Sequence, residues 1–316
     1  MSSDAIQPRN GANLIECGEG WEAMNRNPFI FRHRLADHPL FQIPQLVNVA
    51  DRVVERGDTN KWIVVGDKSL DVLPGKERLS QALSRIEEGE TWLKMSSLHE
   101  IDPAYDELLR TILTEMEELT GLPIQRTMTW RGITVFVASP KKVTPYHFDH
   151  DTNFLFQIKG DKDVYLFDSH DRSVLTEEEI ELFYAGNPMA GKYRADLENR
   201  GALYRLSPGA AVHQPPLAPH LIINGNNVSV SVSIFFSFAE ADSQAKVYQA
   251  NYCLRKLGLR PTPPGNSSLI DGLKIGALSS VSKRRPKTQN ELLYSGFKNI
   301  TNPFREARKL VQERGR

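Results

Sequence analysis

The chain has 316 residues, of which 40% are hydrophobic and 25% charged, the composition of an ordinary globular protein with one large domain or two. Its two cysteines are too few for a disulfide framework. No apolar run reaches the roughly 20 residues of a membrane helix, and the first residues do not resemble a secretory signal. These features argue against a membrane protein or a disulfide-rich secreted domain and predict a cytoplasmic protein.

The net charge is zero, but the charge is unevenly distributed along the chain. From Asn251 to the C-terminus there are 14 Lys/Arg and four Asp/Glu, a local charge of +10, so the first 250 residues carry −10. A basic C-terminal region can bind RNA. It can also be a solvated tail, or one that docks on the acidic body of its own or a second chain. We favour a solvated or docked tail over RNA binding, because the region has no dense basic run besides Lys283–Lys287.

In chain order, residues 1–25 are polar and glycine-rich and are predicted to be extended or disordered. Residues 26–124 are predicted to form a mainly helical region that packs on the following domain. Its clearest helix follows Asp102 and Pro103, because Asp caps free N–H groups and Pro suits the first helical position, and it ends at Gly121. Its apolar residues follow one helical face: Tyr105, Leu108, Leu109, Ile112, Met116 and Leu119.

From residue 125 to 239 the pattern changes to that of short strands. The predicted strands lie at 133–138, around 147–149, and at 153–159, 163–167, 202–206, 211–213 and 228–234. The last of these, V-S-V-S-V-S-I, alternates without interruption and is the clearest. One helix interrupts the strands at 176–186, where Thr176 and Glu179 match a capping box.

Residues 240–316 return to the helical period, in 244–257 and again after Asn302-Pro303, with a Pro/Gly/Ser-rich link at 260–268. Helices, then many short strands, then helices predict a mainly β protein with α-helical flanks, built around a barrel or sandwich.

His147 and Asp149 are the centre of the functional prediction. On a strand, residues i and i+2 point to the same face, so this imidazole and carboxylate can converge on one point. A second imidazole from elsewhere would complete the two-histidine, one-carboxylate set of non-haem iron(II) oxygenases. An isolated H-x-D pair is a weak signal, because a surface or core histidine is its more common explanation.

The sequence around this pair resembles the JmjC-type, cupin-like oxygenases. The segment 144–162, T-P-Y-H-F-D-H-D-T-N-F-L-F-Q-I-K-G-D-K, is especially similar to the asparaginyl hydroxylase of the hypoxia response in residue types and intervals. The segment 206–220, L-S-P-G-A-A-V-H-Q-P-P-L-A-P-H, resembles the family's G-D-x-x-x-x-P-x-x-x-x-H stretch. The resemblance implies a double-stranded β-helix (a cupin-like jelly roll) and makes residues 125–239 the catalytic core.

The resemblance also implies a metal site in which His147, Asp149 and His220 bind Fe(II) and are the catalytic residues. His213 competes with His220 for the position of the distal ligand, and the family's glycine-to-histidine interval selects His220. Two departures from the family pattern occur nearby. Ala210 stands where the family usually has Asp, and Ala218-Pro219 replaces paired tryptophans before the distal histidine.

For the cosubstrate, the resemblance implies 2-oxoglutarate, with O₂ as the second cosubstrate. Lys162 and Thr144 correspond to the cation and hydroxyl that bind the far carboxylate, and Asn153 to a polar neighbour. A lysine is a compact charge that can pair with such a carboxylate in a buried pocket. The alternative is a solvated Lys162 beside Asp161 and Asp163.

The predicted function is hydroxylation of a protein or peptide side chain, with succinate and CO₂ as co-products; demethylation is possible by the same chemistry. The alternatives are an RNA or small-molecule hydroxylase, a cupin enzyme with another metal, and a non-catalytic cupin-like metal-binding protein. Helices that follow the barrel often form the dimer in this family, so residues 244–257 and 304–311 are candidates for a homodimer interface. No membrane partner is expected.

Overall fold

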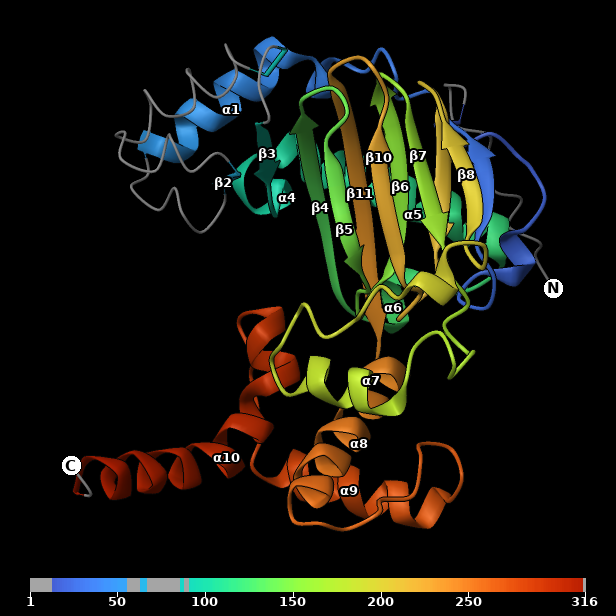
Figure 1. The fold of residues 1–316 in the computed structure, drawn as a ribbon. Helices are drawn as coiled ribbons and strands as arrows, with labels where there is room; N and C mark the ends of the chain where they lie inside the picture. The colour runs from blue at the N-terminus through green and yellow to red at the C-terminus, as the bar shows by residue number, and fades with distance from the viewer. Residues whose placement is uncertain (1–12, 56–62, 67–85, 88–90, 315–316) are drawn as a thin grey trace, which may run out of the picture.

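The computed structural model describes residues 13–55, 63–66, 86–87 and 91–314. Its strands form two antiparallel sheets, a major sheet in the order β1-β9-β6-β11-β4-β3-β2 and a minor sheet in the order β5-β10-β7-β8 (Figure 1). The strands are β1 (Phe29–Arg32), β2 (Ile63–Val65), β3 (Trp92–Met95), β4 (Met128–Ala138), β5 (Val143–His147), β6 (Thr152–Lys159), β7 (Lys162–Leu166), β8 (Ala202–Leu206), β9 (Ala210–Gln214), β10 (His220–Asn224) and β11 (Ser229–Phe238). The helices are α1 (Ile43–Glu55), α4 (Leu98–Ile101), α5 (Pro103–Thr120), α6 (Ile124–Thr127), α7 (Glu177–Tyr184), α8 (Ala239–Lys256), α9 (Ser268–Ser280) and α10 (Gln289–Arg314).

The strands from β4 to β11 are wound as a double-stranded β-helix. The first pairs with the last, β4 with β11, and inside this pair β5 pairs with β10, β6 with β9 and β7 with β8. Such nested antiparallel pairing, divided between two facing sheets, is the jelly-roll topology. The fold class predicted from the sequence is confirmed.

The alternating pattern of β11 shows which side of the major sheet is apolar. Its valines and isoleucine (Val230, Val232 and Ile234) lie in the main hydrophobic core together with residues of the N-terminal helices. The serines between them (Ser229, Ser231 and Ser233) are also buried, but on the opposite face, toward the minor sheet. The main core therefore lies outside the barrel, under the N-terminal region, and the barrel interior carries polar groups beside a smaller apolar cluster that includes Leu155, Val164 and Leu166.

The N-terminal region supplies both helices and strands. Helix α5 begins and ends as predicted, because the Asp102 side chain accepts a hydrogen bond from Ala104 N and Gly121 adopts φ 69° at the C-cap. The strands β1 to β3 of this region were not predicted. Each has only three or four residues and is defined by its pairing with β9, β4 or a neighbour. Such short segments have too few residues for an alternating pattern to appear.

Part of the N-terminal segment predicted to be extended or disordered, residues 1–12, lies outside the described residues. From residue 13 the chain packs on α5 and on the major sheet, where Trp21 stacks on Phe154. Glu115 of α5 accepts hydrogen bonds from Leu14 N and Ile15 N at 3.0 and 2.8 Å, and Ile15 and Trp21 are buried.

Helices α7 to α10 gather beyond one end of the barrel (Figure 1). The predicted capping box of α7 is present, with reciprocal hydrogen bonds between Thr176 and Glu179. Helix α8 matches the prediction for 244–257, α9 was not predicted, and α10 begins before Asn302-Pro303 instead of after it. Within the described part of the chain, no helix combines the length and apolarity that crossing a membrane requires.

Candidate metal centre

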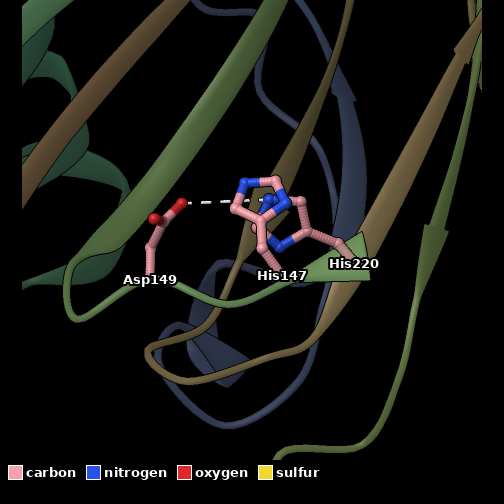
Figure 2. A group of neighbouring side chains, drawn as sticks. All are labelled: His147, Asp149 and His220. Carbon is pink, nitrogen blue, oxygen red and sulfur yellow. Dashed lines mark ion pairs between the residues drawn. The ribbon is translucent and has the colours of Figure 1, made fainter. Parts of the chain in front are cut away.

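The two predicted histidines come from neighbouring strands of the minor sheet. His147 is the last residue of β5, His220 is the first of β10, and the two are paired directly across the ladder. Asp149 follows in the connection to β6, so the strand rule used to predict the pair does not apply, because the strand ends at His147. The chain nevertheless brings the groups together: the three side chains point toward one another (Figure 2), and their ligand atoms all lie within 4.8 Å.

Each of these imidazoles is oriented by a backbone carbonyl. His147 Nδ1 lies 2.8 Å from Pro145 O, and His220 Nδ1 lies 3.0 Å from Ala218 O. Because a carbonyl oxygen only accepts hydrogen bonds, Nδ1 carries a proton in both rings, so Nε2 is the nitrogen that a metal ion would bind. A hydrogen bond of this kind from the second ring nitrogen is usual in metal-binding histidines.

The spacing and protonation of the cluster fit one metal ion. His220 Nε2 lies 3.8 Å from Asp149 Oδ2, and an ion bound at roughly 2.0–2.2 Å can contact two atoms up to about 4.4 Å apart. Burial, and to a smaller extent His147, lowers the pKa of His220 to about 4. The ring is therefore neutral near pH 7 and can act as a ligand. Two imidazoles and one carboxylate suit Fe(II) and leave coordination positions open for other ligands.

Thr144 lies on the same face of the minor sheet as the histidines. In a regular strand it would point away from His147, three residues along. A β-bulge changes this: His220 pairs with His147, but Ile222 pairs with Thr144, so β5 contains one extra residue between the two pairs. Because His220 and Ile222 share a face, Thr144 is returned to the face of His147.

Lys162 begins β7 and is buried between the sheets. It shares the buried face of its strand with Val164 and Leu166, which pack against the major sheet. It pairs with Asn224, four residues or roughly 13 Å along β10 from His220, and its flexible four-carbon stem can shorten that distance. The residue is 7% exposed, and burial lowers the pKa of its ammonium to about 7. Lys162 is therefore not the solvated lysine of the alternative interpretation.

Asn153 lies near the start of β6, four residues after Asp149. Its amide nitrogen donates to Gln214 Oε1 at 2.6 Å, and its oxygen accepts from Ser233 Oγ at 2.6 Å. Both amide atoms are thus fixed by protein contacts. Among the described residues, Nε2 of Gln214 is buried without a hydrogen-bond partner.

His213, the competitor of His220, is not part of the cluster. It is fully buried among aromatic rings, with its ring stacked on that of Phe154 at 4.6 Å between centroids. Its Nε2 accepts a hydrogen bond from Asn25 N at 3.0 Å, and burial lowers the pKa of the ring to about 3. With Nε2 already used, His213 is a neutral core histidine. His170, in the connection after β7, is exposed.

The turn before β9 has Ala210 where the JmjC-type oxygenases usually have aspartate, and other contacts support it. His33 N donates to Gly209 O at 2.9 Å, and the His33 ring contacts Ala210 O at 3.1 Å. Gly209 has φ 84°, which explains the glycine. The N-terminal region thus supplies the support that Ala210 cannot.

The polar lining of the barrel interior was not predicted from the sequence. Besides Ser233, Ser231 Oγ donates to Gln157 Oε1 at 2.8 Å, so the serines of β11 form hydrogen bonds across to β6. The signal was present in V-S-V-S-V-S-I, because a strand with apolar residues on one face and small hydroxyls on the other has two distinct faces. The sequence could not show that the hydroxyl face points inward.

The fold and the site together define the class of protein: a double-stranded β-helix with two histidines and one carboxylate at one end. No family model and no curated protein matches this chain. Among solved structures, it is similar to Escherichia coli YcfD at 13% identity, with 92% of this chain and 69% of YcfD covered and a TM-score of 0.45. Another structure, described as YcfD, a ribosomal oxygenase from Escherichia coli, in complex with cobalt and 2-oxoglutarate, has 14% identity, coverages of 91% and 68%, and a TM-score of 0.45. Similarity at this level defines neither a family nor an activity for this chain.

Proposed function

We propose that this protein is an Fe(II)- and 2-oxoglutarate-dependent oxygenase that hydroxylates a protein or peptide side chain. One observation carries the proposal. The barrel that brings His147, Asp149 and His220 together also buries Lys162 on the same inner face, where burial is the one cause that shifts its pKa. A buried lysine without a counter-charge is costly to fold, and a dicarboxylate cosubstrate bound at the metal would supply that charge.

The residues have separate tasks in this proposal. His147, Asp149 and His220 would hold the metal, and Lys162 with Thr144 would bind the far carboxylate of 2-oxoglutarate. Asn153, fixed by Gln214 and Ser233, would contribute a rigid polar wall. Bound Fe(II) with 2-oxoglutarate and O₂ supplies the oxidising chemistry, with succinate and CO₂ as co-products.

A large substrate is favoured by the exposure of the site. The Asp149 side chain is 50% exposed and His147 is partly exposed, whereas His220 and Lys162 are buried. The metal centre is therefore open to solvent on the side of Asp149 and His147, and it is closed on the inner side, at His220 and Lys162. A side chain presented by a protein or peptide can reach such a site from outside. RNA is the alternative, through the exposed basic residues Lys283–Arg285.

The first experiment needs no substrate. Without oxygen, Fe(II) and then 2-oxoglutarate are added to the purified protein, and we expect the weak visible charge-transfer band of a chelated keto acid. Bound iron without a band would point to a cupin with other chemistry, and no bound iron to a non-catalytic protein.

In air, succinate release stimulated by peptides would support the proposed substrate class. Stimulation by RNA, with a steep salt dependence, would replace it.

We also propose that the helices after the barrel form a homodimer. Most buried side chains of α8 are covered within the same chain, and the side chains of 304–311 lie outside those described. Among the described residues, exposed apolar side chains gather on α9 and at the end of α8: Leu257 at 76%, Leu269 at 75% and Leu273 at 68%. We expect Leu269→Lys with Leu273→Lys to convert a dimer to a monomer in sedimentation equilibrium. A monomeric wild type would contradict the proposal.

A further inference from the structure

Residues 147–151 are called the ligand segment below. From His147 to His150, their side chains face the metal centre and the helices beyond the barrel in turn. His147 and Asp149 face each other's ligand atoms at the metal centre. Phe148, between them, is 1% exposed and belongs to the hydrophobic cluster of the helices beyond the barrel. Its ring lies 4.7 Å from that of Phe183 on α7. The residue that separates the two ligands is therefore part of the core of the helical region.

The next residue, His150, is held by two of these helices. Its Nδ1 lies 2.8 Å from the Tyr184 hydroxyl on α7, and its Nε2 lies 2.9 Å from Asp242 Oδ1 on α8. All three side chains are buried. Because both ring nitrogens have partners in the helices, the backbone next to Asp149 cannot shift without breaking a buried hydrogen bond.

Asp151 does not return to the metal centre and also contacts the helices, through α10. Its Oδ1 accepts hydrogen bonds from Gln289 Nε2 at 2.6 Å and from the Ser237 hydroxyl. On the other side, Asp149 O accepts a hydrogen bond from Leu217 N at 2.8 Å, in the loop that leads to His220. The ligand segment is thus joined to α7, α8 and α10 and to the connection that carries the distal histidine.

We propose that α7, α8 and α10 position the metal centre, with His150, Asp151, Asp242 and Gln289 as positioning residues. This inference rests on the proposed metal site. The half-exposed Asp149 carboxylate has few contacts of its own, so its direction depends on the backbone of the ligand segment, and the helices fix that backbone. A ligand held in its binding geometry loses less freedom when the ion binds. By reciprocity, the bound ion stabilises the packing of the helices.

Gln289→Ala tests the contact that is most distant in sequence. The variant removes one hydrogen bond from α10 to Asp151 and leaves the ligands intact, and we expect about tenfold weaker Co(II) binding in a visible absorption titration. Asn299→Ala is the matched control, since Asn299 is an amide on the same helix that donates to Val281 O at 2.7 Å, away from the ligand segment. It should bind Co(II) like the wild type.

Asp242 provides the second test, with a rescue. Asp242→Ala should weaken Co(II) binding by at least as much as Gln289→Ala and alter the Co(II) absorption spectrum. Asp242→Asn keeps an acceptor for His150 and should restore both. In the wild type, Co(II) should slow amide hydrogen exchange in α8 and at the start of α10.

These measurements distinguish the positioning role from the proposed oxygenase activity. If Gln289→Ala and Asp242→Ala fold and bind Co(II) with wild-type affinity and spectrum, the positioning role is overturned and the metal site is not. The same holds if Co(II) slows hydrogen exchange only in the barrel. A wild type that binds Co(II) but gives no 2-oxoglutarate band would refute the oxygenase proposal and leave this inference intact. A wild type that binds no Co(II) would overturn both.

Discussion

Replacement of His220 by alanine is expected to lower the affinity for Co(II) or Fe(II) by more than 100-fold. The residue is 3% exposed, its ring is fixed by Ala218 O, and its Nε2 lies 3.8 Å from Asp149 Oδ2. Loss of an outer partner of a metal ligand typically costs about 10–100-fold in affinity, so loss of the ligand itself should cost more. Isothermal titration calorimetry with Co(II) measures the effect directly.

Two other histidines make this prediction specific. His170→Ala removes an exposed imidazole and should leave Co(II) affinity unchanged. His213→Phe should lower the melting temperature, because Asn25 N loses its acceptor, and yet retain metal binding. If His213→Phe abolished binding and His220→Ala did not, the assignment of the distal ligand would be reversed.

Lys162→Ala is expected to weaken 2-oxoglutarate binding to the Co(II)-loaded protein by about 30-fold or more. Removal of one member of a buried, hydrogen-bonded charge pair typically costs about 2–5 kcal/mol. Lys159→Ala, an exposed lysine at the end of β6 in the same hairpin, is the matched control.

A second ligand separates the two ends of the cosubstrate. 2-Oxobutyrate has the keto-acid group but no far carboxylate, so its affinity should be the same in wild type and Lys162→Ala. A loss of affinity for both acids would show that the substitution damages the site in general. Unchanged affinity for 2-oxoglutarate would remove Lys162 from the site.

The ligand-free protein should also show the buried charge of Lys162 in its pH dependence. Burial lowers the pKa of this ammonium from 10.5 to about 7. Between these values the unfolded chain binds a proton that the folded chain has released, so the free energy of unfolding should rise as the pH increases from about 7 toward 10. The slope is at most about 1.4 kcal/mol per pH unit.

Lys162→Met should remove this pH dependence and stabilise the ligand-free protein near pH 7 by roughly 2–5 kcal/mol, because no charge is then buried. Urea denaturation of wild type and variant at several pH values measures both effects. A pH profile that is the same in the two proteins would mean that Lys162 is solvated or paired in solution.

The sequence by itself determined the features that depend on local pattern. The cap at Asp102, the stop at Gly121, the capping box of α7 and the alternation of β11 are all short-range signals, and the structure has each of them. The candidate ligands were also predicted from local sequence, because the resemblance of two short segments to the JmjC-type oxygenases implied His147, Asp149 and His220 and not His213.

The tertiary structure alone decided where these segments meet. The bulge that returns Thr144 to the inner face depends on pairing with β10, and the burial of Lys162 depends on the opposite sheet. Pro303 lies inside α10, although proline is a local signal against a helix. The rest of the helix overrides that signal. Likewise, Gln289 reaches Asp151 across 138 residues of sequence. Contacts of this kind form when elements that are distant in sequence pack together. Such packing leaves no periodic pattern in the sequence of either element.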